Sequence, residues 1–153
     1  MPDFELNGHA VRSVAAPDTP LLDVLRNELG LKGTRYGCGL EQCGSCMVLV
    51  DGAPAYACSR EVGSVAGRQV TTIEGLAGHP LIAAFIEEQA GQCAYCVPGI
   101  VVSAKALLDR DPRPDRAAIV AALDAHLCRC GAQTRMLRAV ARAAAAMNPG
   151  ATT

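Results

Sequence analysis

Residues 33–58 read GTRYGCGLEQCGSCMVLVDGAPAYAC, and this segment governs how the first half of the chain folds. It contains a C-x4-C-x2-C array followed by one further cysteine, which is the plant-type spacing of 2Fe–2S proteins. Its glycines let the backbone turn sharply around a compact anionic group and leave amide N–H groups free to point at sulfur. The array therefore predicts a 2Fe–2S cluster with the ligands Cys38, Cys43, Cys46 and Cys58.

Zinc is the alternative occupant of this array. Zinc knuckles prefer two short C-x2-C pairs. Here one arm has the longer C-x4-C spacing and is rich in glycine. The spacing favours the iron–sulfur interpretation.

The segment also belongs to a β-rich half. Asn7-Gly8 and Asp51-Gly52 are strong signals for two-residue hairpin turns. Between the hairpins we expect a helix capped by Thr19, with Pro20 in its first turn and Gly30 after its end. Cys58 should lie on the strand that follows the second turn. The predicted strands are residues 4–6, 9–14, 47–50 and 53–58.

The second half shows helical periodicity instead. We expect four helices with short connections, and a boundary between the halves near Glu74 to Gly78. The apolar positions of the first helix, Leu81, Ile82, Phe85 and Ile86, should face inward. The helices should begin at Pro80, Pro98, Pro114 and Thr134. The first should stop near Gly91, the third should run through Leu123, and the fourth should end before Asn148.

Four more cysteines stand between these helices. Cys93 and Cys96 form a C-x2-C pair, and Cys128 and Cys130 form a C-x-C pair. In an antiparallel bundle the two junctions lie at one end, but the spacing alone leaves zinc, a disulfide and an iron–sulfur cluster open. The first predicted cluster favours a second 2Fe–2S cluster, because two redox centres in one small chain make an electron path.

Composition excludes several classes of function. The 153 residues carry a net charge of −1 without a basic stripe, which argues against binding to nucleic acid. No apolar run approaches the roughly 18 residues of a membrane span, and Met1 to Glu5 do not resemble a signal peptide. We therefore expect a cytoplasmic protein without membrane insertion, although export together with a partner is compatible with the sequence. Eight cysteines in such a chain indicate metal or redox chemistry rather than disulfides.

Six motifs in a fixed order carry a family resemblance. The chain resembles the small iron–sulfur subunit of the molybdenum hydroxylases, the xanthine dehydrogenase and aldehyde oxidase group. The matching segments are residues 33–40, 42–46, 70–76, 79–80, 92–99 and 127–130.

The resemblance implies an α+β fold in which a ferredoxin-like β-grasp domain, residues 1–75, precedes a four-helix bundle domain, residues 76–153. It also implies a large partner subunit that holds molybdopterin, in the cytosine dinucleotide form, and hydroxylates an N-heteroaromatic or aldehyde substrate with oxygen from water. Gln92 matches the residue that contacts the pterin, and Cys130 matches the cluster ligand beside it. Electrons would pass through the bundle cluster and then the ferredoxin-type cluster toward a flavin, a cytochrome or another acceptor. A free-standing two-cluster ferredoxin and a zinc-stabilised interaction module are the alternative functions.

Three positions depart from the family pattern. Glu41 replaces a frequent glycine, and its charge should lower the reduction potential of the first cluster. His126 stands where many relatives have asparagine and is the histidine nearest to a metal, whereas His9 should lie on the surface and His79 should shape a helix start. Gly131 after Cys130 is similar to bacterial enzymes that act on N-heteroaromatics, such as isoquinoline oxidoreductase and nicotinate dehydrogenase.

Overall fold

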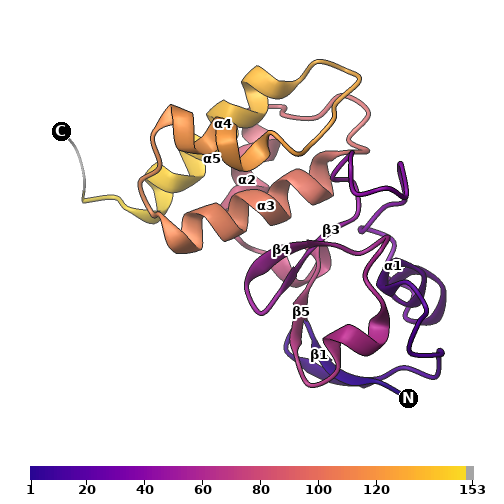
Figure 1. Cartoon of the computed structure of the whole chain (residues 1–153). Helices are drawn as coiled ribbons and strands as arrows, with labels where there is room; N and C mark the ends of the chain where they lie inside the picture. Colours follow the sequence, from indigo (N-terminus) through magenta and orange to yellow (C-terminus); the bar gives the residue numbers. More distant parts are fainter. Residues whose placement is uncertain (151–153) are drawn as a thin grey trace.

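The computed structural model describes residues 1–150 and has an α+β architecture. All five strands precede residue 72, and the four longer helices follow residue 79. Figure 1 shows the helices gathered at one end of the molecule and the sheet at the other, with the C-terminal part of the chain at the helical end. Residues 151–153 of the predicted second domain lie outside the described part of the chain.

The sheet is mixed and has the strand order β2-β1-β5-β3-β4. Both predicted hairpins are confirmed: Asn7 and Gly8 join β1 to β2, and Asp51 and Gly52 join β3 to β4, all four with positive φ. The strands are β1 (Asp3–Leu6), β2 (His9–Arg12), β3 (Met47–Val50), β4 (Ala53–Tyr56) and β5 (Gln69–Thr71).

The central strand β5 was not predicted. It pairs parallel to β1 and antiparallel to β3, and it thereby joins the two hairpins into one sheet. Only three residues form it. A segment that short carries no periodicity of its own, so its state depends on the two hairpins that receive it.

The predicted helix between the hairpins is present but differs from expectation. It begins as α1 (Leu21–Asp23) and continues as a π-helical turn, η1 (Val24–Glu28). The prediction of Thr19 as its cap was wrong, because Pro20 occupies the N-cap position and no side chain caps the helix. Instead the Thr19 carbonyl accepts a hydrogen bond of 2.8 Å from Val62 N–H, at the start of the short 3-10 turn η2 (Val62–Val65).

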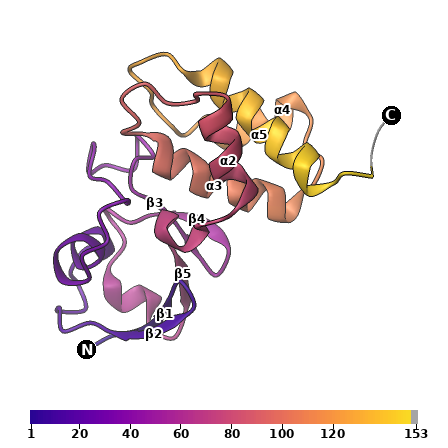
Figure 2. The ribbon, with the colours of Figure 1, turned by 180° about the vertical axis from the view of Figure 1, so that it is seen from behind.

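The four helices of the second half are confirmed. They are α2 (Pro80–Glu87), α3 (Val97–Arg110), α4 (Arg116–Leu123) and α5 (Gln133–Met147), preceded by the 3-10 turn η3 (Ile73–Leu76). Figure 2, from behind, shows α2 and α5 side by side over α3. The prediction that Ile86 faces inward was wrong: it is 71% exposed, because α2 presents its other apolar residues to α3 and α5.

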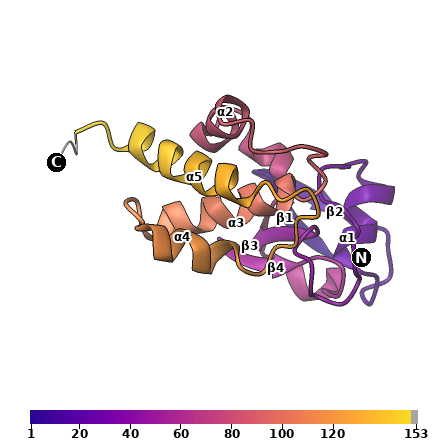
Figure 3. The ribbon, with the colours of Figure 1, turned by 90° about the horizontal axis from the view of Figure 1, so that it is seen from above.

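Strand β3 connects the two halves through its alternating side chains. Val48 and Val50 belong to the apolar cluster of the sheet and α1. Met47 and Leu49 point to the opposite face and belong to the cluster of the four helices. All four residues are buried, so β3 lies between two cores, and the view from above in Figure 3 shows α3 next to it.

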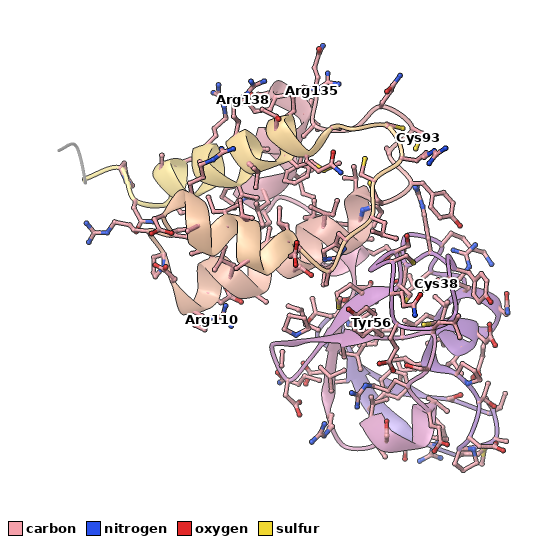
Figure 4. All side chains as sticks on the ribbon, turned by 45° about the horizontal axis from the view of Figure 1, so that its top comes forward. Cys38, Tyr56, Cys93, Arg110, Arg135 and Arg138 are labelled. Atoms are coloured by element: carbon pink, nitrogen blue, oxygen red, sulfur yellow. The ribbon has the colours of Figure 1, made fainter. Side chains whose placement is uncertain are left out.

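One ion-pair network joins α2 to α5. Glu88 accepts hydrogen bonds from Arg138 Nε at 3.0 Å and from Arg142 Nε at 2.8 Å, and Arg142 also reaches Glu87. The hydrogen bonds from Arg142 and Arg138 lower the pKa of Glu88 below its ordinary value of 4.5. Figure 4 shows Arg138 on the exposed side of α5.

We expect Glu88→Gln to reduce the acid sensitivity of the fold. A carboxylate with a depressed pKa stabilises the folded state at neutral pH, and this contribution is lost as pH falls through the folded-state pKa. Urea unfolding at pH 7 and at pH 4 or below should therefore show a smaller difference for the variant than for the wild type. Glu5→Gln, at an exposed position on β1, is the control. An unchanged difference in Glu88→Gln would contradict the role of this network.

No helix within residues 1–150 has the length and apolar character needed to cross a membrane.

Candidate metal centres

The eight cysteines lie in two groups on loops where the sheet and the helices meet. Figure 4 shows Cys38 on the loop above the sheet and Cys93 on the loop between α2 and α3, both facing the same side of the molecule. None of the eight forms a disulfide. The structure thus places Cys38, Cys43, Cys46 and Cys58 in one group and Cys93, Cys96, Cys128 and Cys130 in another, the grouping that the spacing predicted.

Backbone amides surround the first thiol of the N-terminal group. Cys38 Sγ accepts hydrogen bonds of 3.3 Å from the N–H groups of Leu40 and Gln42. Its own N–H donates to Cys43 Sγ, also at 3.3 Å. The hydrogen bonds from Leu40 and Gln42 lower the pKa of Cys38 to about 7. The loop is therefore built to hold a thiolate, the form that binds metal.

The other two thiols of this group form a second pair. Cys46 is buried at the start of β3, within hydrogen-bond reach of the Cys58 thiol. Burial raises the pKa of Cys46 to about 12, because removal from water disfavours the charged thiolate. Cys58 lies two residues beyond the end of β4, in a turn, so the prediction that it sits on the strand was wrong.

The second group is paired in the same manner across two loops. Cys93 is within hydrogen-bond reach of Cys130, and Cys96 is within reach of Cys128. Cys96 is buried at the N-cap of α3, and burial raises the pKa of its thiol to about 12. The hydrogen bond from the Tyr95 N–H, followed by that from Cys130, lowers the pKa of exposed Cys93.

This pairing suits a binuclear cluster, in which each iron takes two protein thiolates. The strongest interactions between these thiols run across the two loops, from Cys93 to Cys130 and from Cys96 to Cys128. Within residues 1–150 no three Cys, His, Asp or Glu side chains surround one ion position. The donors present, thiolates with amide N–H groups directed at sulfur, are those that 2Fe–2S clusters use.

Two glycines keep side-chain atoms out of the first cysteine loop. A Cβ at Gly37 would lie 2.5 Å from Cys43 Sγ. Gly39 has φ +68°, and a Cβ there would lie 2.5 Å from the Tyr36 hydroxyl. Any larger residue at Gly37 would displace a proposed ligand, which explains why this loop needs glycine next to Cys38.

Glu41 also adopts the left-handed conformation, with φ +57°. Glycine occupies this region without strain, whereas in other residues it costs about 1 kcal/mol or more. The Glu41 carboxylate accepts a hydrogen bond from the Ser59 hydroxyl, next to Cys58. Its charge is therefore held beside both ends of the first cysteine group.

We expect Glu41→Gln to raise the reduction potential of the first cluster. Removing one negative charge about 10 Å away changes the potential by tens of millivolts, for effective dielectric constants of about 20 to 80. Redox titration of the holo complex followed by electron paramagnetic resonance measures this shift. Glu5→Gln removes the same charge from an exposed position on β1 and should leave the potential unchanged. A fall in potential in Glu41→Gln would refute the electrostatic interpretation.

The two cysteine loops contact each other directly. Leu127 N–H donates to the Cys43 carbonyl at 3.1 Å, so one hydrogen bond links a cysteine of the first group to the neighbour of Cys128. Arg35 donates to the Ala94 carbonyl at 2.6 Å and lies over the Tyr95 ring, 5.0 Å from its centroid.

Tyr95 completes this second contact, since its hydroxyl donates to the Tyr36 carbonyl at 2.6 Å. Sequence reasoning missed both contacts. The paired Arg35-Tyr36 and Ala94-Tyr95 dipeptides beside cysteines were the available signal, but contacts across 59 residues require the tertiary structure.

The three histidines behave differently. His9 is exposed on β2, as predicted. His79 is the N-cap of α2 and accepts a hydrogen bond from Leu81 N–H, which confirms its role at the helix start. His126 is buried next to both cysteine loops, and burial lowers its pKa to about 4, so its ring is neutral.

Gln92, the predicted pterin contact, is exposed beside Cys93. It lines a surface hollow with Ile86, Val97 and Arg135 of the flanking helices. Cys130, the other predicted contact, is half-buried. Cys130 interacts with Cys93, the neighbour of Gln92, so both predicted contacts lie in the same part of the helical half.

Two family models match the chain. The 2Fe-2S iron-sulfur cluster binding domain matches residues 4–73, and the [2Fe-2S] binding domain matches residues 72–141. One chain of the nicotinate dehydrogenase from Pseudomonas putida is 52% identical, over 92% of this chain and 92% of the relative. The alpha chain of isoquinoline 1-oxidoreductase from Brevundimonas diminuta is 48% identical, over 94% and 97%.

Solved structures share the fold. Quinoline 2-oxidoreductase from Pseudomonas putida contains a chain with a TM-score of 0.92 and 30% identity, covering 99% of this chain and 97% of that one. The aldehyde oxidoreductase of Desulfovibrio desulfuricans gives a TM-score of 0.93 and 39% identity over 99% of this chain, which spans only 17% of the larger enzyme.

Proposed function

Because this chain belongs to the small 2Fe–2S subunits of the molybdenum hydroxylase family, we propose that it carries electrons through two clusters from a molybdopterin site on a large partner subunit to an acceptor. The observation that carries the proposal is the direct contact between the two cysteine groups, through the hydrogen bond from Leu127 N–H to the Cys43 carbonyl. Two redox centres held on contacting loops form a continuous path for single electrons.

The proposed ligands follow the pairing of the thiols. One iron of the first cluster would take Cys38 and Cys43, and the other Cys46 and Cys58. The second cluster would be held by Cys93 with Cys130 and by Cys96 with Cys128. A bound cluster supplies one-electron redox chemistry, while the chain's amide N–H groups stabilise the negative charge on sulfur.

The proposed division into a β-grasp domain, residues 1–75, and a helical bundle domain, residues 76–153, follows the two apolar clusters. One cluster of buried apolar side chains lies in the sheet and α1, and the other apolar cluster is built mainly from the four helices. Strand β3 contributes to both, so we expect the domains to form one rigid unit.

The direction of electron flow follows from which loop faces the partner. Gln92 and Cys93 are exposed on the helical half and would meet the pterin of the large subunit, in its cytosine dinucleotide form, with Cys130 adjacent. Electrons would enter the helical cluster and leave through the cluster of the sheet half, toward a flavin, a cytochrome or another acceptor. The similarity to nicotinate dehydrogenase and isoquinoline 1-oxidoreductase supports an N-heteroaromatic substrate over an aldehyde for the complex, and we propose that the complex acts in the cytoplasm.

Purification of the native complex tests this function. We expect a large chain with a molybdenum cofactor to copurify, about four irons for each small chain, and two distinct 2Fe–2S signals by electron paramagnetic resonance. A freely diffusing monomer with both clusters and reversible redox activity would instead establish a free-standing ferredoxin. A colourless, zinc-containing protein would contradict both.

A further inference from the structure

His126 is the one buried histidine in residues 1–150, and neither cysteine pairing nor the family motifs explain it. It stands two residues before Cys128, in the loop between α4 and α5. The side chain is only 7% exposed. A polar ring in such a place requires a structural or functional reason, since burying a polar group without partners is costly.

The ring is anchored to α3 on one side. Its Nε2 lies 2.7 Å from the Ser103 hydroxyl, and Ser103 is itself buried. Ser103 lies in the helix that begins immediately after Cys96, so this hydrogen bond ties the Cys128 loop to the helix that starts at a second proposed ligand.

On its other side the ring packs against the first cysteine loop. A Cβ at Gly44, between Cys43 and Cys46, would lie 2.2 Å from His126 Nδ1. A Cβ at Gly99 would lie 2.1 Å from the Gly44 carbonyl oxygen and 3.5 Å from His126 Cε1. Two glycines on different elements thus leave the space that the imidazole fills.

The backbone next to the ring also links the His126 loop to the first cysteine loop. Leu127 N–H donates to the Cys43 carbonyl, and His126 N–H donates at 3.0 Å to the Leu123 carbonyl at the end of α4. His126 therefore lies against three segments next to proposed ligands: the loop of Cys43 and Cys46, helix α3, which begins directly after Cys96, and its own loop with Cys128.

We propose that His126 is a positioning residue that fixes the first cysteine group relative to the second, and so sets the distance and orientation between the two clusters. The proposal rests on the proposed function, since it concerns clusters bound by these cysteines. It predicts that the magnetic coupling of the two reduced clusters, which falls with the cube of their separation, responds to this side chain. Neither the ligand set nor the cluster number should change.

The test uses the holo complex with three variants. His126→Leu keeps the bulk but removes the bond to Ser103, His126→Gln keeps an amide that can reach Ser103, and His9→Leu makes the same change at an exposed position. With both clusters fully reduced at low temperature, electron paramagnetic resonance should show an altered spin–spin splitting in His126→Leu. Wild-type splitting should return in His126→Gln and persist in His9→Leu.

The outcomes separate the possible failures. Two intact signals with wild-type splitting in His126→Leu would overturn the positioning role. A wild-type complex without two cluster signals would overturn the proposed function instead. If His126→Leu fails to fold, Ser103→Ala replaces it, since only the hydroxyl is lost. A smaller change of splitting is then expected, and an unchanged splitting overturns the proposal.

Discussion

Cys43→Ser is expected to remove one of the two clusters and to leave the other in place. A serine hydroxyl is a poor substitute for a thiolate, and Cys43 pairs with Cys38 in the first group only. Iron content should fall from about four to about two atoms per small chain, and one of two resonance signals should disappear. Turnover with the physiological acceptor should fall by more than the roughly tenfold that loss of an outer-shell partner of a metal site already costs, since the path to the acceptor is interrupted.

Cys128→Ser is the matched variant for the second group, because Cys128 pairs with Cys96 and lies beside the same inter-loop contact. It should remove the other signal and retain the one that Cys43→Ser loses. Loss of both signals in either variant, or of neither, would contradict the proposed assignment of four cysteines to each cluster.

Gly99→Ala is expected to destabilise the joint between the two halves. The added Cβ would lie 2.1 Å from the carbonyl oxygen of Gly44, which is backbone and therefore cannot rotate away. Overpacking of this kind costs about 1–3 kcal/mol, and replacing glycine by alanine in a helix gains about 1 kcal/mol of helix propensity. Because the clash is severe, we take the upper overpacking cost and expect a net loss of roughly 2 kcal/mol in the free energy of unfolding. The free energy of unfolding from urea titration measures the loss.

Gly150→Ala is the control, because no heavy atom lies within 4 Å of a Cβ built there. It should change the free energy of unfolding by less than about 0.5 kcal/mol. Gly99→Ala should also lower the iron content of purified complex, because α3 begins directly after Cys96. Wild-type stability in Gly99→Ala would mean that the helix and the Gly44 loop separate without cost.

Signals that act within a few residues specify the hairpins, the four later helices and the grouping of the cysteines. Asn7-Gly8 and Asp51-Gly52 set their turns locally, since left-handed residues in those pairs match the twist of the strands. Helical periodicity and prolines at helix starts are equally local, and the sequence and the structure agree that α2 begins at Pro80. The spacing of the C-x4-C-x2-C array is also local, since it is set only by the lengths of the segments between the cysteines. These features were therefore predictable from the sequence.

Other features arise only when distant segments pack together. Strand β5 is too short to show a pattern, and it forms because its backbone pairs with β1 on one side and with β3 on the other. Ile86 has the correct spacing for an inward position yet is exposed, since the direction of the apolar face depends on where α3 and α5 lie. A hydrophobic pattern shows which face of a helix is apolar, but it does not show which other elements will cover that face.

The two cysteine groups show the same division. Spacing assigned each cysteine to a group, because ligands of one loop are close along the chain. Which thiols pair in the second group depends on how the loop before α3 and the loop before α5 pack together. The contact of Leu127 with Cys43 depends on docking segments more than 80 residues apart. The buried place of His126 between Gly44 and Ser103 has the same origin, since a contact among three elements exists only once all three have packed.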